Sequence, residues 1–259
     1  MPWPVCAGNP SMNITTATLI GSTAAYALGS IPFGYLIARL VAGIDIRDHG
    51  SGNIGATNVG RVLGARWGIL ALVLDFLKGL LPVWLVPIAL VSQGDPRLIH
   101  VTVACGVATI LGHMYPCWLR LRGGKGVATA LGVVAWLSPV ATLVAFLVFA
   151  ASFALWRIVS LSSMLAAIGF AICGMWLALP APFSATQWSL SLFTLAIPAL
   201  IVLRHRTNLR RLLRGEEKPF HAGRRVPPPS SPDSHLSDSA ESARNTEVQA
   251  VRERPQDPA

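Results

Sequence analysis

The sequence predicts an all-α integral membrane protein with seven transmembrane helices, its N-terminus outside the cell and its C-terminus in the cytoplasm. Three observations lead to this prediction. Hydrophobic residues make up 53% of the 259 residues and charged residues only 13%, about half the charged share of a soluble domain. The charges gather at the end of the chain, where residues 204–259 hold eight of the 12 acidic residues. Connections rich and poor in Lys and Arg also alternate along the chain.

Seven apolar stretches account for the predicted helices, because one crossing of a bilayer takes about 20 residues. The fourth and fifth stretches are short and are separated only by Ser138 and Pro139. We expect two helices with a tight turn there, since Pro interrupts a helix but can begin one. The expected spans are 16–42, 67–92, 98–118, 124–137, 139–156, 161–180 and 186–204.

The distribution of Lys and Arg sets the orientation and the domains. Residues 1–15 contain neither, whereas the connection 43–66 contains three arginines and 204–214 contains five. The positive-inside rule therefore places the N-terminus outside and the C-terminus inside. We expect an extracytoplasmic N-terminus at 1–15 and a membrane domain at 16–215. The Pro- and Ser-rich remainder, 216–259, is expected to be a disordered cytoplasmic tail.

Composition also excludes several classes of protein. The net charge of +9 fits basic cytoplasmic loops, and no nucleic-acid-binding motif is present, so no nucleic-acid partner is expected. The four cysteines are widely spaced and match neither a disulfide framework nor a metal site. Acidic residues are too few in the membrane domain to hold a divalent ion, so we expect no metal and no cofactor.

The most informative segment is the loop from Gly50 to Asn58, which the charge pattern places on the cytoplasmic side. Eight of its residues are small or carry an amide, and one is Ile. Its three glycines permit positive φ angles, so that successive N–H groups could face an anion. The weaker alternative is a flexible connection between helices. The candidate phosphate ligands are Gly50, Ser51, Gly52, Asn53, Gly55, Ala56, Thr57, Asn58 and, shortly after them, the charged Arg61.

A second glycine-rich turn, Gly123-Gly124-Lys125-Gly126, opens the fourth span. Glycines before a helix bring N–H groups and the positive end of the helix dipole towards a ligand, and Lys125 adds a charge. The strand and outer glycine of a nucleotide-binding P-loop are missing. Taken alone, the turn is better explained as a basic anchor to lipid headgroups.

Three further groups of polar residues lie in or near the spans. His113 ends the third span, and we expect its side chain to bond to loop backbone rather than to act as an acid or base. One of the serines in Ser160–Ser163 is expected to cap the sixth span, with Ser163 kept as a candidate ligand. Asp75 and Lys78 are three residues apart within the second span, and we favour a structural ion pair over a functional site.

The last span ends in a basic segment that contains His205 and Asn208. These two residues are three apart and therefore share a helix face. An ordinary basic end of a transmembrane helix would explain the arginines of this segment, but not the His–Asn pair. All these motifs lie on the predicted inner face, so short cytoplasmic loops are expected to form an anion site there. No motif follows Arg211, and the tail is expected to be dispensable for chemistry.

Together these segments resemble the bacterial acyl-phosphate:glycerol-3-phosphate acyltransferases. The resemblance runs in order from about residue 16 to 214, and its specific part is the nine-residue loop followed by the Gly-Gly-Lys-Gly turn. The chain departs from the family in residues 117–122, which are poorer in aromatics, and in its long tail. The matching segments are Gly29–Gly34, Gly50–Asn58, Gly112–Pro116, Gly123–Thr129, Ser160–Ser163 and Arg204–Asn208 with Arg211.

The resemblance implies a multi-pass enzyme of the bacterial cytoplasmic (inner) membrane that acts early in phospholipid synthesis. It would move an acyl group from acyl phosphate to the 1-hydroxyl of glycerol 3-phosphate, giving 1-acylglycerol 3-phosphate (lysophosphatidic acid) and phosphate. Its partners would be these two substrates, the lipid bilayer and an upstream enzyme that makes acyl phosphate.

The resemblance also implies roles for particular residues. Ser51, Lys125, His205 and Asn208 would be catalytic. The other candidates would bind substrate: Arg61 and Ser163 would contact glycerol 3-phosphate, the amides of Gly52–Thr57 would hold the phosphate of the donor, and Gly123 and Gly124 would complete the site. The base that takes the proton of the attacking hydroxyl is either His205 or the acceptor's own phosphate, whose second pKa is about 6 by analogy with phosphoserine. The resemblance favours the phosphate, and the residues alone leave both open.

Two other classes of function fit the sequence less well. The second large class of glycerol acyltransferases carries His-x4-Asp, and none of the six histidines is followed by Asp at that spacing. A membrane transporter of a phosphorylated solute is the alternative from outside the enzymes. Transporters usually bind their solute near the midplane between repeated halves, whereas here the polar motifs lie at one face and no repeat is evident.

Overall fold

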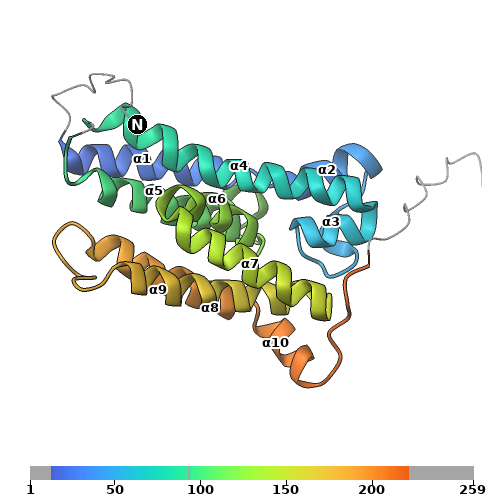
Figure 1. The fold of residues 1–259 in the computed structure, drawn as a ribbon. Helices are drawn as coiled ribbons and strands as arrows, with labels where there is room; N and C mark the ends of the chain where they lie inside the picture. The colour runs from blue at the N-terminus through green and yellow to red at the C-terminus, as the bar shows by residue number, and fades with distance from the viewer. Residues whose placement is uncertain (1–12, 93, 222–259) are drawn as a thin grey trace, which may run out of the picture. The chain divides into compact units, whose positions relative to one another are not determined.

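A computed structural model describes residues 13–92 and 94–221 of the chain. Within these ranges the protein is helical and has no β-strand, which confirms the all-α class (Figure 1). Nearly all of the expected N-terminal segment 1–15 and the sequence after 221 lie outside the described residues.

The helices follow one another with short connections (Figure 1). They are α1 (Ile14–Gly29), α2 (Phe33–Ala42), α3 (Ala56–Leu63), α4 (Ala65–Leu90), α5 (Leu98–Met114), α6 (Val127–Leu137), α7 (Pro139–Trp156), α8 (Val159–Leu177), α9 (Trp188–Arg204) and α10 (Arg206–Leu213), with short 3₁₀ turns η1 (Ile46–Asp48) and η2 (Cys117–Leu119).

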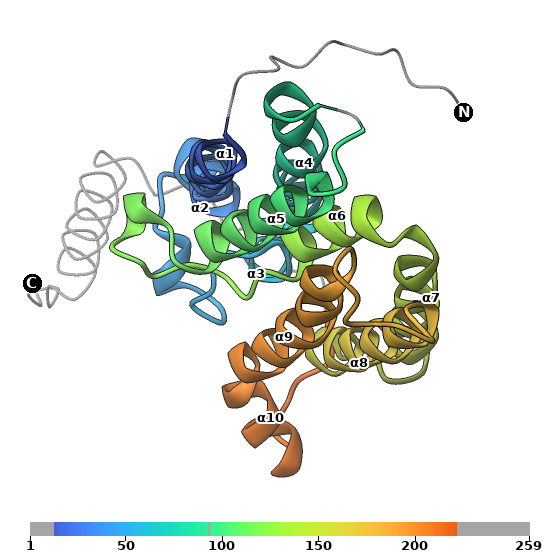
Figure 2. The same ribbon diagram turned by 90° about the vertical axis from the view of Figure 1, so that its left-hand side faces the viewer.

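The long helices form two groups that meet through α5, α6 and α9. In the first group α1 runs along α5, and α4 packs against both α5 and α6. In the second group α7 and α8 form a hairpin, and α9 packs against α8; Figure 2 shows the two groups nearly end-on. One cluster of buried apolar side chains runs through both groups. The membrane domain therefore has a continuous core.

Small residues let α4 and α6 approach each other closely. A Cβ atom added to Gly79 on α4 would lie 2.1 Å from the carbonyl oxygen of Thr129, and one added to Gly132 on α6 would lie 2.1 Å from that of Phe76. Close backbone contact of this kind is a common way to pack helices in a membrane, where burial of apolar surface between helices gives no driving force.

The helices are those of a multi-pass membrane protein. Within the described residues, five segments are long and apolar enough to cross a bilayer, and α9 with α10, bent by 59°, is a sixth if the bent pair counts as one span. The expected turn after the fourth span is confirmed, since α6 ends at Leu137 and α7 begins at Pro139. However, α6 has only 11 residues, fewer than a helix needs to cross alone. The count of seven crossings and the orientation stay predictions.

A break in the first expected span is stabilised by a buried lysine. Residues 30–32 separate α1 from α2, and the Nζ atom of Lys78 donates to the carbonyl of Ile31 at 2.7 Å. The same Nζ atom lies 2.8 Å from Asp75 Oδ1, which confirms the expected ion pair. In an apolar surrounding such a bond helps to satisfy a carbonyl at the break, which also accepts the N–H of Phe33 at 3.2 Å.

Candidate active site

The predicted site residues gather around one cavity of about 310 Å³. The cavity receives residues from the 50–58 loop and α3, from the turn before α6, from the start of α8 and from the α9–α10 bend. Four predicted glycines, Gly50, Gly52, Gly123 and Gly124, do not line it. The predicted residues that do line it are Ser51, Asn53, Gly55, Ala56, Thr57, Asn58, Arg61, Lys125, Ser163, His205 and Asn208.

Asn58 holds the 50–58 loop in shape. Its Oδ1 atom accepts the N–H of Ser51 at 2.7 Å. Its Nδ2 atom donates to the carbonyls of Ile46, His49 and Asn53 at 3.1, 2.9 and 2.9 Å. The side chain is only 1% exposed and both of its polar atoms are used. We therefore revise its expected role from substrate ligand to positioning residue.

The loop offers fewer free amides than expected. Gly50 and Gly52 have the expected positive φ angles, 61° and 69°, but Gly55 has φ −76° and ends the loop in an extended conformation. The N–H of Gly52 already donates to the carbonyl of His49 at 3.0 Å, and that of Gly55 donates to Oδ1 of Asn53 at 2.8 Å. The amides best placed for an anion are those of Ala56 and Thr57, because the first N–H groups of a helix have no partner within it.

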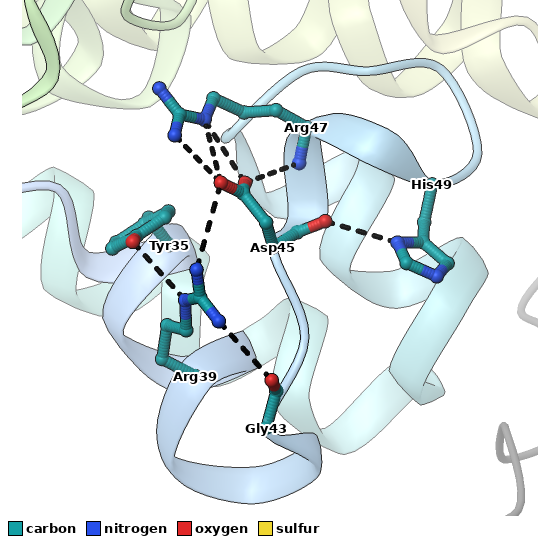
Figure 3. A network of polar contacts seen from close by, with 6 residues as sticks. All are labelled: Tyr35, Arg39, Gly43, Asp45, Arg47 and His49. Atoms are coloured by element: carbon teal, nitrogen blue, oxygen red, sulfur yellow. Dashed lines mark hydrogen bonds and ion pairs between the residues drawn. The ribbon is translucent and has the colours of Figure 1, made fainter. Parts of the chain in front are cut away.

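A polar network fixes the chain just before this loop (Figure 3). Arg47 holds the carboxylate of Asp45 with its Nη2 atom 2.6 Å from Oδ2, and this bond lowers the pKa of Asp45 to about 2. Arg39 bonds to the hydroxyl of Tyr35 at 3.1 Å, and Nδ1 of His49 bonds to the carbonyl of Asp45 at 3.0 Å. The network anchors the carbonyls to which Asn58 donates.

The turn before α6 rests on the end of α5. The N–H of Gly124 donates to the carbonyl of His113 at 3.1 Å, and Arg204 donates to the carbonyl of Gly124 at 2.8 Å. A Cβ atom on Gly124 would lie 2.1 Å from Nε2 of His113, so only glycine fits there. These contacts fix the backbone and leave the Lys125 side chain at the cavity.

The side chain of His113 does not bond to loop backbone, so that expectation is wrong. Its Nδ1 atom lies 3.0 Å from Oγ1 of Thr129 and 3.6 Å from Oδ1 of Asp75. Asp75 and His113 both line the cavity.

Across the described parts of the chain, no three His, Cys, Asp or Glu side chains gather as they would around a metal ion.

A chain of short hydrogen bonds crosses the cavity. The Nζ atom of Lys125 donates to Oδ1 of Asn208 at 2.6 Å, and Nδ2 of Asn208 donates to Oε1 of Glu217 at 2.6 Å. The hydroxyl of Ser160 donates to the same carboxylate oxygen at 2.7 Å. Arg211 pairs with the other oxygen at 3.1 Å. Glu217 therefore ties together α8, α10 and the turn before α6.

Glu217 is a site residue that the sequence did not reveal. The tail was expected to be disordered from 216, but residues 216–221 are described and Glu217 bonds to the helices. That the tail is dispensable for chemistry stays a prediction. The Glu217 side chain is only 6% exposed. The N–H of Phe220 donates to the carbonyl of Arg157 at 2.7 Å, and its ring lies 5.9 Å from the guanidinium carbon of Arg61.

The serines at the start of α8 also differ from expectation. None of them caps the helix, whose N-cap residue is Ile158. The hydroxyls of Ser162 and Ser163 donate to carbonyls four residues earlier, at 3.0 and 2.8 Å. Ser163 nonetheless lines the cavity, where its oxygen can still accept a hydrogen bond.

The cavity is built for an anion. Burial is the main cause that lowers the pKa of Lys125 to about 8; the carboxylate of Glu217 opposes this, and the nearby charges of Arg211 and Arg61 add to it. Cations thus outnumber the carboxylate around this end of the cavity. An anionic substrate would restore the balance and stabilise the charged form of Lys125.

His205 presents one ring nitrogen that can accept a proton. Its Nδ1 atom lies 2.8 Å from the carbonyl oxygen of Ile201, and a carbonyl can only accept, so Nδ1 carries the hydrogen. In the neutral ring Nε2 is then the acceptor. His205 lies at the 59° bend between α9 and α10, is 2% exposed and lines the cavity.

Away from the charged groups the cavity becomes apolar. It continues between α6, α7, α8 and α9, where nonpolar side chains form its wall. These include Leu131, Val134, Ala167, Phe170 and Ile197. One cavity therefore joins an anion site to a space that suits a hydrocarbon chain.

Comparison with known proteins gives a consistent result. The chain matches the sequence model of the glycerol-3-phosphate acyltransferase family over residues 19–215. It is 44% identical over 213 residues to a glycerol-3-phosphate acyltransferase of Anaeromyxobacter sp. (strain Fw109-5), covering 80% of this chain and 98% of the relative. With the Aquifex aeolicus protein of the same name it is 46% identical over 197 residues, 76% of this chain and 95% of the relative.

Two crystal structures of PlsY, an integral membrane glycerol 3-phosphate acyltransferase, have the same fold. The glycerol 3-phosphate form aligns with a TM-score of 0.67 and 40% identity, covering 79% of this chain and 96% of PlsY. The lysophosphatidic acid form aligns with a TM-score of 0.65 and 40% identity, over 80% and 96%. With an anion site, an apolar wall and these relatives in agreement, the chain belongs to the glycerol-3-phosphate acyltransferase family.

Proposed function

We propose that this protein transfers an acyl group from acyl phosphate to the 1-hydroxyl of glycerol 3-phosphate, releasing lysophosphatidic acid and phosphate. The observation that carries the proposal is the single cavity with cations at one end and an apolar wall at the other. The first end suits two phosphates and the second suits an acyl chain. The relatives named as glycerol-3-phosphate acyltransferases support the same reaction.

Lys125 and Arg61 hold the phosphate of glycerol 3-phosphate. Both line the cavity, and bonds between a cation and a phosphate are among the stronger hydrogen bonds in proteins. One of the three N–H donors of Lys125 bonds to Asn208, and the other two remain available for substrate. The amides of Ala56 and Thr57, at the start of α3, hold the phosphate of the donor.

His205 prepares the attacking hydroxyl. Acyl phosphate is a mixed anhydride whose leaving group is a stable anion, so the barrier lies mainly in bringing two anions together and in charge on the carbonyl oxygen. The hydroxyl still has to lose a proton as it attacks. The Nε2 atom of His205 accepts that proton, because Nδ1 is held by the carbonyl of Ile201.

The proposed setting is the bacterial inner membrane, with seven crossings, the N-terminus outside and the C-terminus in the cytoplasm. The alternation of basic connections supports this orientation, and α6 counts as the fourth crossing. An enzyme that forms acyl phosphate has to act upstream, since this chain supplies no activated acyl group. The membrane domain begins with α1, and it extends to His221 rather than to residue 215.

A donor comparison tests the function. Purified protein in detergent would receive labelled glycerol 3-phosphate and either acyl phosphate or acyl-coenzyme A, and labelled lysophosphatidic acid would be measured. We expect acyl phosphate to exceed acyl-coenzyme A in kcat/KM by orders of magnitude, because the thioester lacks the phosphate that orients its carbonyl. Comparable rates from both donors would refute the acyl-phosphate assignment. Uptake of glycerol 3-phosphate into sealed vesicles without lipid product would instead indicate transport.

A further inference from the structure

We propose that four buried side chains close the far end of the cavity and set the length of the acyl chain that the enzyme accepts, with Phe170 as the main determinant. This inference rests on the proposed function, because it assumes that the apolar part of the cavity holds the acyl chain of the donor. The four side chains are Val134 on α6, Ala145 on α7, Phe170 on α8 and Ile197 on α9.

These four residues lie farthest from the anion site on their helices among the residues that line the cavity. On α8 the last polar lining residue is Ser163 and the last lining residue of all is Phe170. On α9 the corresponding pair is His205 and Ile197. With a rise of 1.5 Å per residue, both pairs give a depth of about 10–12 Å. The lining residues of α8 and α9 therefore place the end of the cavity at a similar depth.

Buried side chains form the far wall of the cavity. Val134, Ala145, Phe170 and Ile197 are 7%, 8%, 4% and 5% exposed, and all four belong to the same core cluster. By contrast, Phe146 also lines the cavity but is 55% exposed. The cavity is therefore open to lipid beside Ala145, and an acyl chain that enters there lies against the packed side chains of Val134, Phe170 and Ile197.

Phe170 has the greatest influence on the depth because it is the only large aromatic side chain of the four. One turn nearer the anion site, α8 contributes Ala166 and Ala167 to the wall, whose small side chains leave room for a chain. One leaflet of a bilayer is about 15 Å deep in hydrocarbon, so a cavity of about 10–12 Å is slightly shorter than an ordinary membrane acyl chain. The wall therefore lies at a depth where acyl chains of different lengths would end.

A competition between donors tests the inference. Purified enzyme would receive equal amounts of saturated acyl phosphates from dodecanoyl to octadecanoyl in one tube, with glycerol 3-phosphate, and mass spectrometry would give the ratio of lysophosphatidic acid products. Phe170→Ala should raise the octadecanoyl to dodecanoyl ratio about tenfold or more, since one methylene in an apolar pocket changes kcat/KM by about 10- to 200-fold. Ala145→Leu should lower that ratio by a similar factor.

The matched control is Ile172→Ala on the same helix, because Ile172 is 68% exposed and does not line the cavity. It should leave the ratio unchanged. The product ratio measured in one tube does not depend on how much of the enzyme is active. If the larger cavity of Phe170→Ala prevents folding, Phe170→Leu takes its place. Unchanged ratios in both wall variants, with acyl transfer intact, would overturn the inference. Absence of transfer from every acyl phosphate by the wild-type enzyme would instead overturn the proposed function.

Discussion

The loop of residues 50–58 and the segment of residues 204–217 both contribute to the anion site, but they are built in opposite ways. In the loop, backbone N–H groups and the Asn58 side chain bond to one another within a few residues. In the segment, side chains bond to residues far away in the sequence, as Asn208 does to Lys125. A loop whose hydrogen bonds stay within residues 46–58 supplies shape, whereas the segment supplies the proposed base and holds Lys125 through Asn208. The two regions should therefore respond differently to mutation.

The largest effect is expected in the segment, from His205→Ala. Loss of a general base typically lowers the rate by about 10²- to 10⁴-fold, and we expect kcat to fall in that range with little change in KM for glycerol 3-phosphate. Steady-state kinetics with acyl phosphate at saturation would measure this. A fall of less than about tenfold would assign the proton to the acceptor's own phosphate, whose second pKa is about 6.

The next largest effect is expected from truncation, which tests whether residues 216–221 belong to the active site. A chain that ends after Gly215 loses Glu217, which accepts bonds from Ser160 and Asn208. Hydrogen bonds to a charged group contribute about 1.5–3 kcal/mol, so kcat/KM should fall by roughly 10- to 100-fold. A chain that ends after His221 keeps these contacts and should match the full-length enzyme. Equal activity of both truncations, at equal amounts in the membrane, would show that Glu217 has no part in the site.

Within the loop, Asn58→Ala and Ser51→Ala should separate shape from chemistry. Asn58→Ala removes the acceptor of one N–H group and the donor to three carbonyls. Leaving such groups unpaired costs about 1–3 kcal/mol, so the midpoint of thermal unfolding should fall and activity should fall with it. Ser51 is exposed, and Ser51→Ala should lower activity at an unchanged midpoint. A normal midpoint for Asn58→Ala would return this side chain to the list of substrate ligands.

The same contrast explains how much of the site the sequence could predict. The 50–58 loop and the Gly-Gly-Lys-Gly turn are contiguous and biased in composition, so their residue types alone indicate anion binding. Asn58 was assigned a ligand role because its partners, such as the carbonyl of Ile46, are backbone groups that no residue type reveals. Glu217 was missed because a single carboxylate in a charged tail carries no pattern, and only the fold brings it to Asn208.

The fold was easier to predict than its details. Apolar stretches locate the long helices because a bilayer imposes their length and composition. The break at residues 30–32 was not predicted, since it depends on Lys78, which reaches the carbonyl of Ile31 from another helix. For the same reason, the partner that His113 finds in Thr129 could not be read from the third span alone.

A smaller effect should appear in the pH profile. The pKa of Lys125 is lowered to about 8, mainly by burial, so in the free enzyme this amine loses its charge as pH rises through about 8. The kcat/KM for glycerol 3-phosphate reports groups of the free enzyme and substrate, and we expect it to fall above that pH. Lys125→Arg should remove this alkaline decline even if its overall activity is lower, because Arg stays charged. A decline that persists in Lys125→Arg would assign it to another group.

The smallest effect concerns the network that anchors the loop. The pKa of Asp45 falls from its ordinary value of 3.8 to about 2 because Arg47 bonds to the carboxylate (Figure 3). A carboxyl group whose pKa is lower in the folded state stabilises that state above its unfolded pKa, and this contribution is lost as pH falls through the folded value. The pair lies near the surface, so the contribution should be about 1 kcal/mol or less. Wild type should therefore be slightly more stable than Asp45→Asn in thermal unfolding at neutral pH, and the difference should disappear between about pH 4 and pH 2. A difference that stayed constant down to pH 2 would mean that the Asp45 carboxylate acts through its shape rather than through its charge, and that the loop is anchored mainly by the bonds of Asn58.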